Sequence, residues 1–137
     1  MATRTRNPRP EWLPSRGVLG PVPAGIWWDA VTVEGTLGQA LAERVSSSTA
    51  DGSPGPMLCD PRGPVPKVYF LVPQGTATRW DEPGTEALGE CCYVGIPGDL
   101  DPDPSTVHWL APPTAPVPDL VRPELLLTLL GELRAAS

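Results

Sequence analysis

The segment "KVYFLVPQGTATRW" (Lys67–Trp80) joins a β-prone apolar run to a proline and a turn. The segment "GECCYVGIPG" (Gly89–Gly98) has the same arrangement, because its apolar run also ends at a proline. Proline has no N–H to donate to a β-ladder, so Pro73 and Pro97 are expected to end two strands at one rim of a sheet. The rim is predicted to form a binding site. Its candidate residues are Pro73, Gln74, Pro97, Gly98, His108 and Trp109.

Further elements are predicted on either side of these two strands from hydrophobic periodicity and turn residues. The run at 26–33 is largely apolar on both faces, which is typical of a strand inside a sheet. Thr36 and Gln39 match a capping box at the start of a helix. "PRGP" provides a turn between 56–60 and the strand that follows, which predicts a hairpin. The predicted elements are strand 26–33, helix 34–48, strands 56–60, 67–73, 91–97 and 107–113, and helix 118–137.

The order of these elements predicts an α+β domain. Short connections between successive strands favour a mostly antiparallel sheet of about five strands, with two helices packed on one face. Residues 74–90 are predicted to be an irregular connection, and residues 1–24 a flexible, disordered, basic and proline-rich leader. The remainder, 25–137, is predicted to be a single domain.

Charge is distributed unevenly along the chain. The formal net charge is −6, yet residues 1–20 carry four arginines against Glu11, a local +3, which leaves −9 for the rest. An acidic body repels the phosphate backbone, so any nucleic-acid contact is expected to be weak and confined to the leader. The arginines concerned are Arg4, Arg6, Arg9 and Arg16.

The lack of recognisable targeting signals and the pattern of cysteines both favour a cytoplasmic location. No 7–15-residue apolar run follows the first arginines, and no stretch approaches the roughly 20 apolar residues that span a bilayer. We therefore expect neither a signal peptide nor a membrane segment. The cysteines number three, and two of them are adjacent, which is not the pattern of a disulfide framework.

Few side chains combine into a recognisable catalytic or metal site. "DLDPDP" fails as a calcium loop because Pro104 and Leu110 replace its required glycine and glutamate. Cys59, a vicinal cysteine and His108 could be zinc ligands or a thiol–imidazole pair, but the simpler interpretation makes them strand residues. Asp29 is a carboxylate inside an apolar strand. It either lies near a strand end, accepts a hydrogen bond from an arginine, or binds a metal.

Over residues 26–133 the chain resembles the N-terminal region of bifunctional DNA primase/polymerase-like proteins of GC-rich bacteria. The motifs that carry this resemblance are "WWDAVTVEG", "GPMLCDPRGPVPKVYFLVPQGTA", "LGECCYVGIPGD", "VHWLAPP" and "RPELLLTLLGEL". The resemblance implies a role in DNA replication and a cluster of carboxylates that holds divalent metals for nucleotidyl transfer. Asp29 occupies the position of the first acid, but Val31 or Thr32 occupies that of its companion. The resemblance therefore implies a truncated, catalytically degenerate copy.

Three hypotheses about function follow. The first is a degenerate primase/polymerase-like domain that acts as a small binding or accessory module without a cofactor. The second is an unrelated interaction domain that dimerises or binds a partner through the C-terminal helix, using Leu126, Leu129, Leu130 and Leu133. The third is a residual nucleotidyltransferase with Mg²⁺ or Mn²⁺ held by Asp29, Glu34 and Asp60. The missing acids favour a protein that is not an enzyme.

Overall fold

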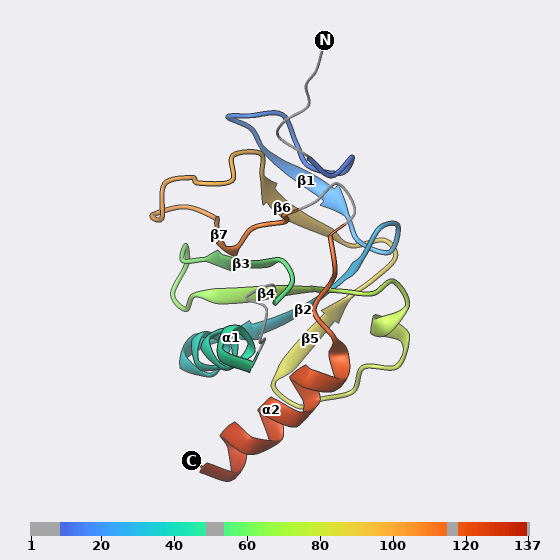
Figure 1. Ribbon diagram of the computed structural model, residues 1–137, viewed down its shortest axis with the longest axis vertical. Coiled ribbons are helices and arrows are strands. Elements are labelled where there is room, and N and C mark those ends of the chain that lie inside the picture. Colours follow the sequence, from blue (N-terminus) through green and yellow to red (C-terminus); the bar gives the residue numbers. More distant parts are fainter. Residues whose placement is uncertain (1–8, 49–53, 115–117, 137) are drawn as a thin grey trace.

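The computed structural model describes residues 9–48, 54–114 and 118–136 (Figure 1). Within these residues the chain forms seven strands, two α-helices and one 3₁₀ turn, which confirms the α+β class. The elements in chain order are β1 (Leu19–Pro23), β2 (Asp29–Glu34), α1 (Gly35–Ser48), β3 (Met57–Asp60), β4 (Lys67–Val72), η1 (Thr76–Thr78), β5 (Thr85–Leu88), β6 (Tyr93–Pro97), β7 (His108–Ala111) and α2 (Pro123–Ala136). No helix in this described part of the chain is long and apolar enough to cross a membrane.

A five-stranded antiparallel sheet forms the centre of the fold, with the strand order β5-β2-β4-β3-β7. The predicted hairpin is confirmed as β3 and β4, in which Asp60 pairs with Lys67 next to the turn. The strand predicted at 26–33 begins instead at Asp29, because Ile26 and Trp27 lie exposed in the preceding turn. The short edge strand β5 lies in the segment 74–90, which was predicted to be irregular.

Both helices pack on one face of this sheet, as predicted. Their buried side chains meet those of β2, β3 and β4 in a single apolar cluster, which we call the helix-face core. Gly38 allows α1 to approach closely, since a Cβ at that position would lie 2.3 Å from the Val33 carbonyl oxygen. The helix-face core includes Val31, Val33, Leu41, Val45, Phe70, Val72, Leu126, Leu129 and Leu130.

The opposite face of the sheet is covered by the segment that contains Trp12 and Leu13 and by a two-stranded ribbon of β1 and β6 (Figure 1). Trp12 packs edge-to-face against the fully buried Trp28 at a centroid distance of 5.6 Å, and also contacts Trp109. We call this second apolar cluster the tryptophan core. The strand predicted at 91–97 exists as β6 but begins only at Tyr93, because Cys91 lies in a turn with φ 72°, and it pairs with β1 in a separate sheet.

The structure differs from the predicted leader over residues 9–24. Trp12 is buried in the tryptophan core and β1 pairs with β6, so this segment is part of the fold. The reason is non-local, because the backbone groups of β1 find their partners some seventy residues further along the chain. Arg9 donates to the Pro14 carbonyl oxygen at 2.6 Å, whereas Arg16 is exposed. Arg4 and Arg6 lie outside the described residues.

Candidate ligand pocket

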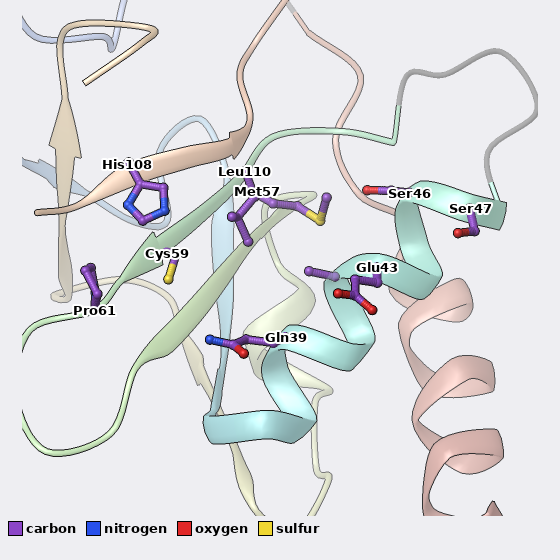
Figure 2. Close-up of a pocket in the computed structure, with 10 residues that line it drawn as sticks. Gln39, Glu43, Ser46, Ser47, Met57, Cys59, Pro61, His108 and Leu110 are labelled. Carbon is purple, nitrogen blue, oxygen red and sulfur yellow. The ribbon is translucent and has the colours of Figure 1, made fainter. Parts of the chain in front are cut away.

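A pocket of about 760 Å³ lies between α1 and the β3–β7 side of the sheet, and we call it the α1–β7 pocket (Figure 2). Its volume lies within the range of about 300–1,000 Å³ that is usual for ligand pockets. Four polar side chains of α1 form one wall, and residues of β3, β7 and the turn after β3 form the other side. The lining residues are Gln39, Ala42, Glu43, Ser46, Ser47, Met57, Cys59, Pro61, His108 and Leu110.

The placement of α1 over the sheet leaves this space open. The helix buries Gly38, Leu41, Ala42 and Val45, and its close contact is with β2, where Gly38 meets the Val33 carbonyl. Strand β7 lies at the sheet edge, beyond β3 and away from that contact. The helix therefore covers the middle of the sheet more fully than its β7 edge.

A bulge shapes the β7 side of the pocket. Leu58 pairs with Trp109 while Met57 pairs with Ala111, so Leu110 is the additional residue on β7. Leu110 is 43% exposed and lines the pocket, whereas Trp109 points into the tryptophan core. Bulges of this kind re-aim side chains and are common at sheet edges and beside functional sites.

Cys59 and His108 are cross-strand neighbours in this pocket. Burial, and to a smaller extent the negative charge of Asp60, raises the pKa of the Cys59 thiol. A raised pKa lowers the fraction of thiolate, which is the nucleophilic form of cysteine. The pair is therefore suited to lining a pocket rather than to nucleophilic attack, in agreement with the simpler interpretation of these residues.

The His108 ring is oriented by its own strand. Its Nδ1 lies 2.8 Å from the Thr106 carbonyl oxygen. A carbonyl oxygen only accepts hydrogen bonds, so we assign the proton to Nδ1 as the donor. In this tautomer Nε2 carries a lone pair and is an acceptor.

Asp29 has a structural role at a different site. It is the first residue of β2 and only 2% exposed, and its Oδ2 accepts hydrogen bonds from the backbone N–H groups of Gly75 and Ala77 at 3.0 and 2.8 Å. The prediction of a position near a strand end is confirmed, but these donors are backbone amides and not an arginine. Asp29 lines a second pocket of about 510 Å³ with Gly25, Gln74 and Glu90 among others.

The three carboxylates predicted as metal ligands do not come together. Asp29 and Glu34 begin and end β2, about 16 Å apart for five residues of extended chain. Asp60 lies on β3, and Lys67 of β4 pairs with both Glu34 and Asp60 across the sheet. In the parts of the chain that the structure describes, no group of three or more His, Cys, Asp or Glu side chains is arranged to hold a metal ion.

The Asp60 carboxylate is paired with the guanidinium group of Arg62. Its Nε lies 2.8 Å from Asp60 Oδ1, and its Nη2 lies 3.0 Å from Oδ2. The hydrogen bond from the Arg62 side chain lowers the pKa of Asp60 below its usual value. The two oxygens of Asp60 thus form an intramolecular ion pair.

The six residues predicted to form one binding rim lie in different parts of the fold. Pro73 and Gln74 follow β4, where the Gln74 side chain donates to the Gly25 carbonyl oxygen at 2.7 Å. Pro97 lies in the ribbon opposite Leu19, and the Gly98 N–H donates to Val18. Trp109 is buried in the tryptophan core. Of the six, only His108 lines the α1–β7 pocket.

The leucines predicted as a partner surface are occupied within the chain. Leu126, Leu129 and Leu130 are buried in the helix-face core, and Leu133 packs against it. Leu127 is the exposed leucine of α2, at 43%. The stripe faces the chain's own sheet, so in this structure it is not available to a partner.

The polar wall of the α1–β7 pocket was not predicted from the sequence. Gln39, Glu43, Ser46 and Ser47 recur at i, i+4, i+7 and i+8, so they share one side of α1. That spacing is equally typical of a helix side that faces only water. What makes it a pocket wall is the uncovered sheet edge beside it.

Comparisons with known proteins leave the family open. No protein-family model, curated protein or solved structure matches the chain. The resemblance to primase/polymerase-like proteins therefore stays a prediction from its short motifs.

Proposed function

We propose that this protein is a binding module that holds a small ligand in the α1–β7 pocket. The observation that carries the proposal is the convergence of polar side chains from α1 and apolar side chains from β3 and β7 on one pocket. An apolar floor with a few convergent polar groups is the usual composition of a ligand site. This proposal agrees with the small binding or accessory module that the sequence predicts.

The two sides of the pocket supply different contributions to binding. Met57, Leu110 and Ala42 offer apolar surface, and burial of apolar area is worth about 25 cal/mol per Å². Gln39, Ser46 and Ser47 offer hydrogen-bonding groups that fix the orientation of a ligand. The proposal thus assigns affinity mainly to the sheet side and specificity mainly to the helix side.

Binding accounts for the site better than catalysis does. The raised pKa of Cys59 disfavours a thiolate nucleophile, and the Asp29 carboxylate is used by two backbone N–H groups. The proposal does not depend on kinship with primase/polymerase-like proteins. If that kinship holds, the α1–β7 pocket rather than a two-metal centre would be where the chain acts in DNA replication.

We also propose that the protein works in the cytoplasm. All three cysteines are unpaired, and Cys91 is exposed. Free exposed thiols persist in reducing compartments, whereas disulfides accumulate in oxidising ones.

The proposed function can be tested by NMR with three fragments of similar size. The fragments are 2-phenylethanol, 2-phenylethylamine and 3-phenylpropanoate, which are uncharged, cationic and anionic at neutral pH. At least one of them is expected to shift the backbone amide signals of Gln39, Ser46, Cys59 and His108 in the ¹⁵N-labelled full chain. Absence of shifts at these positions with all three fragments would contradict the proposal.

A blocking variant locates the binding. Ser46 is exposed and lines the pocket, so Ser46→Trp places a large ring across the space and is expected to abolish the shifts. Thr128→Trp is the matched control, because Thr128 is exposed on α2, outside the residues that line the pocket. Shifts that persist unchanged in Ser46→Trp would place the fragments elsewhere and reject the pocket.

A further inference from the structure

We propose that the α1–β7 pocket selects an organic cation, namely an ammonium group on an apolar stem. This inference rests on the proposed function, since it names the class of ligand that the same pocket takes. It is carried by the acceptors that line the pocket, by the lack of cationic side chains among its described lining residues, and by the apolar floor.

Glu43 is the first acceptor. It lies on the exposed side of α1 and is the only carboxylate among the described residues that line the pocket. Within the described residues it takes part in none of the ion pairs, which join Arg44 to Glu132, Arg62 to Asp60, Lys67 to Glu34, and Arg134 to Glu82. Its negative charge is therefore available to a ligand.

His108 supplies a second acceptor from the other side. In the neutral imidazole with Nδ1–H donating to the Thr106 carbonyl oxygen, Nε2 carries a lone pair. Figure 2 shows His108 and Cys59 on the strands and Glu43 and Gln39 on the helix, on two sides of the same space. An ammonium group has three N–H donors and no acceptor, so it matches a carboxylate on one side and an imidazole nitrogen on the other.

The cationic side chains in the described part of the chain lie outside the pocket lining. Among the residues that the structure describes, no lysine or arginine lines the pocket, and the nearby Arg44 and Arg62 form ion pairs with Glu132 and Asp60 at 3.0 and 2.8 Å. An anionic ligand would meet Glu43 without a counter-charge, in a protein whose net charge is already −6. Charge complementarity therefore favours a cation and disfavours an acid.

The stem of the ligand is expected to be apolar. Met57 and Ala42 are buried and Leu110 is partly exposed, so their contact surfaces form an apolar floor between the two acceptors. A free arylalkylamine and the side chain of a lysine both combine an ammonium group with such a stem. The shared chemistry is the same, and the two sources are separated by the choice of probe.

The test compares affinities of the same three fragments for the full chain at pH 7.5, by NMR titration. 2-Phenylethylamine is expected to bind about five- to tenfold more tightly than 2-phenylethanol, and 3-phenylpropanoate to bind most weakly, because a single partly hydrated carboxylate discriminates modestly. Nα-acetyl-lysine N-methylamide serves as the second cationic probe. Binding of this probe without binding of 2-phenylethylamine would assign the cation to a peptide side chain.

Glu43→Gln is the decisive variant, because it removes the charge while keeping the size of the side chain. The preference for the amine over the alcohol is expected to disappear. Glu124→Gln is the matched control, since Glu124 is exposed in the first turn of α2, outside the pocket lining. A thermal melt of both variants checks that they fold.

The outcomes separate the inference from the proposed function. Equal affinity for the three fragments, or a preference for the amine that survives Glu43→Gln, would overturn the cation inference and leave the pocket as a binding site. Failure of every probe to bind would overturn the proposed function and the inference together.

Discussion

The pocket around Asp29 and the α1–β7 pocket have volumes of about 510 and 760 Å³; Asp29 and Glu90 line the first, and Glu43 lines the second. Asp29 is 2% exposed and accepts two backbone hydrogen bonds. Glu43 is exposed and, within the described residues, forms no ion pair. Asp29 thus holds the chain together, whereas Glu43 keeps its acceptor oxygens for a ligand.

The difference follows from the cost of desolvation. A carboxylate removed from water is costly unless the protein supplies hydrogen bonds in place of the lost solvent. The N–H groups of Gly75 and Ala77, just before and within η1, meet that requirement for Asp29. Glu43 remains hydrated on α1 and needs no such partner. An acid inside an apolar strand is therefore a weaker indicator of function than an acid beside an uncovered sheet edge.

The largest effect is expected from Asp29→Ala. The N–H groups of Gly75 and Ala77 lose their acceptor, and the free energy of unfolding should fall by about 2–4 kcal/mol. Asp29→Asn retains one acceptor oxygen and should lose less. Urea denaturation measures both variants against the unmodified chain. Glu43→Gln should leave the free energy of unfolding unchanged. An equal loss of stability in Asp29→Ala and Glu43→Gln would show that the two acids do not differ in their structural role.

A smaller effect is expected from Gly25→Ala in the wall of the Asp29 pocket. Gly25 has φ +90°, and a Cβ there would lie 2.7 Å from the Glu90 backbone nitrogen. The variant should lose roughly 1–3 kcal/mol of stability through backbone strain and overpacking. Gly131→Ala is the control, because no atom besides its chain neighbours and the nearby backbone of its own helix lies within 4 Å of its Cβ position in α2. This control should gain up to about 1 kcal/mol from helix propensity, and a Gly25→Ala variant as stable as Gly131→Ala would contradict the prediction.

Thiol labelling probes the α1–β7 pocket. Cys59 is 6% exposed and its thiol pKa is raised by burial, so N-ethylmaleimide should label it at least about tenfold more slowly at pH 8 than exposed Cys91. Single-cysteine variants with serine at the other two positions give each rate by mass spectrometry. Because the thiolate reacts, the Cys59 rate should continue to rise as the pH passes 9. Saturating 2-phenylethylamine should slow the labelling of Cys59 and leave the labelling of Cys91 unchanged. Equal labelling rates at Cys59 and Cys91 in the free protein would be inconsistent with the buried position of Cys59.

The smallest effect is expected from Asp60→Asn, on the strand that carries Cys59. The ion pair with Arg62 is partly exposed, with side-chain exposures of 19% and 54%, so its loss should cost no more than about 1 kcal/mol at pH 7. The pKa of Asp60 is lowered in the folded state. Its contribution is therefore present above the unfolded carboxyl pKa and is lost as the pH falls through the folded one. The free energies of unfolding of Asp60→Asn and the unmodified chain should therefore become equal in acid. A difference between them that grows toward low pH would contradict this pH dependence.

The parts of the fold that were predicted correctly depend on neighbours in the chain. The β3–β4 hairpin follows from two β-prone runs joined by a proline-glycine turn, and α2 follows from leucines at helical spacing. The elements that were missed depend on distant partners. Strand β1 is recognisable only once β6 lies beside it, and β5 is a four-residue edge strand against β2. Local periodicity carries too little information about such short strands.

The same distinction holds for the candidate site. Asp29, Cys59 and His108 stand out from their residue types and surroundings in the sequence, but their roles did not follow from it. Cys59 faces His108 because of the register between β3 and β7, and the polar side of α1 becomes a wall because the helix packs nearer the centre of the sheet. Both depend on contacts between distant segments.

The sequence alone determined the α+β class, both helices, the central hairpin and the acidic character of the body, since these depend on periodicity, turn residues and composition. Only the tertiary structure decided that the N-terminal tryptophan is buried, that β6 leaves the main sheet, and that Asp29 supports a turn. It also decided where the α1–β7 pocket lies. The physical reason is that burial and strand pairing are settled by the best packing of the whole chain, which no short segment encodes by itself.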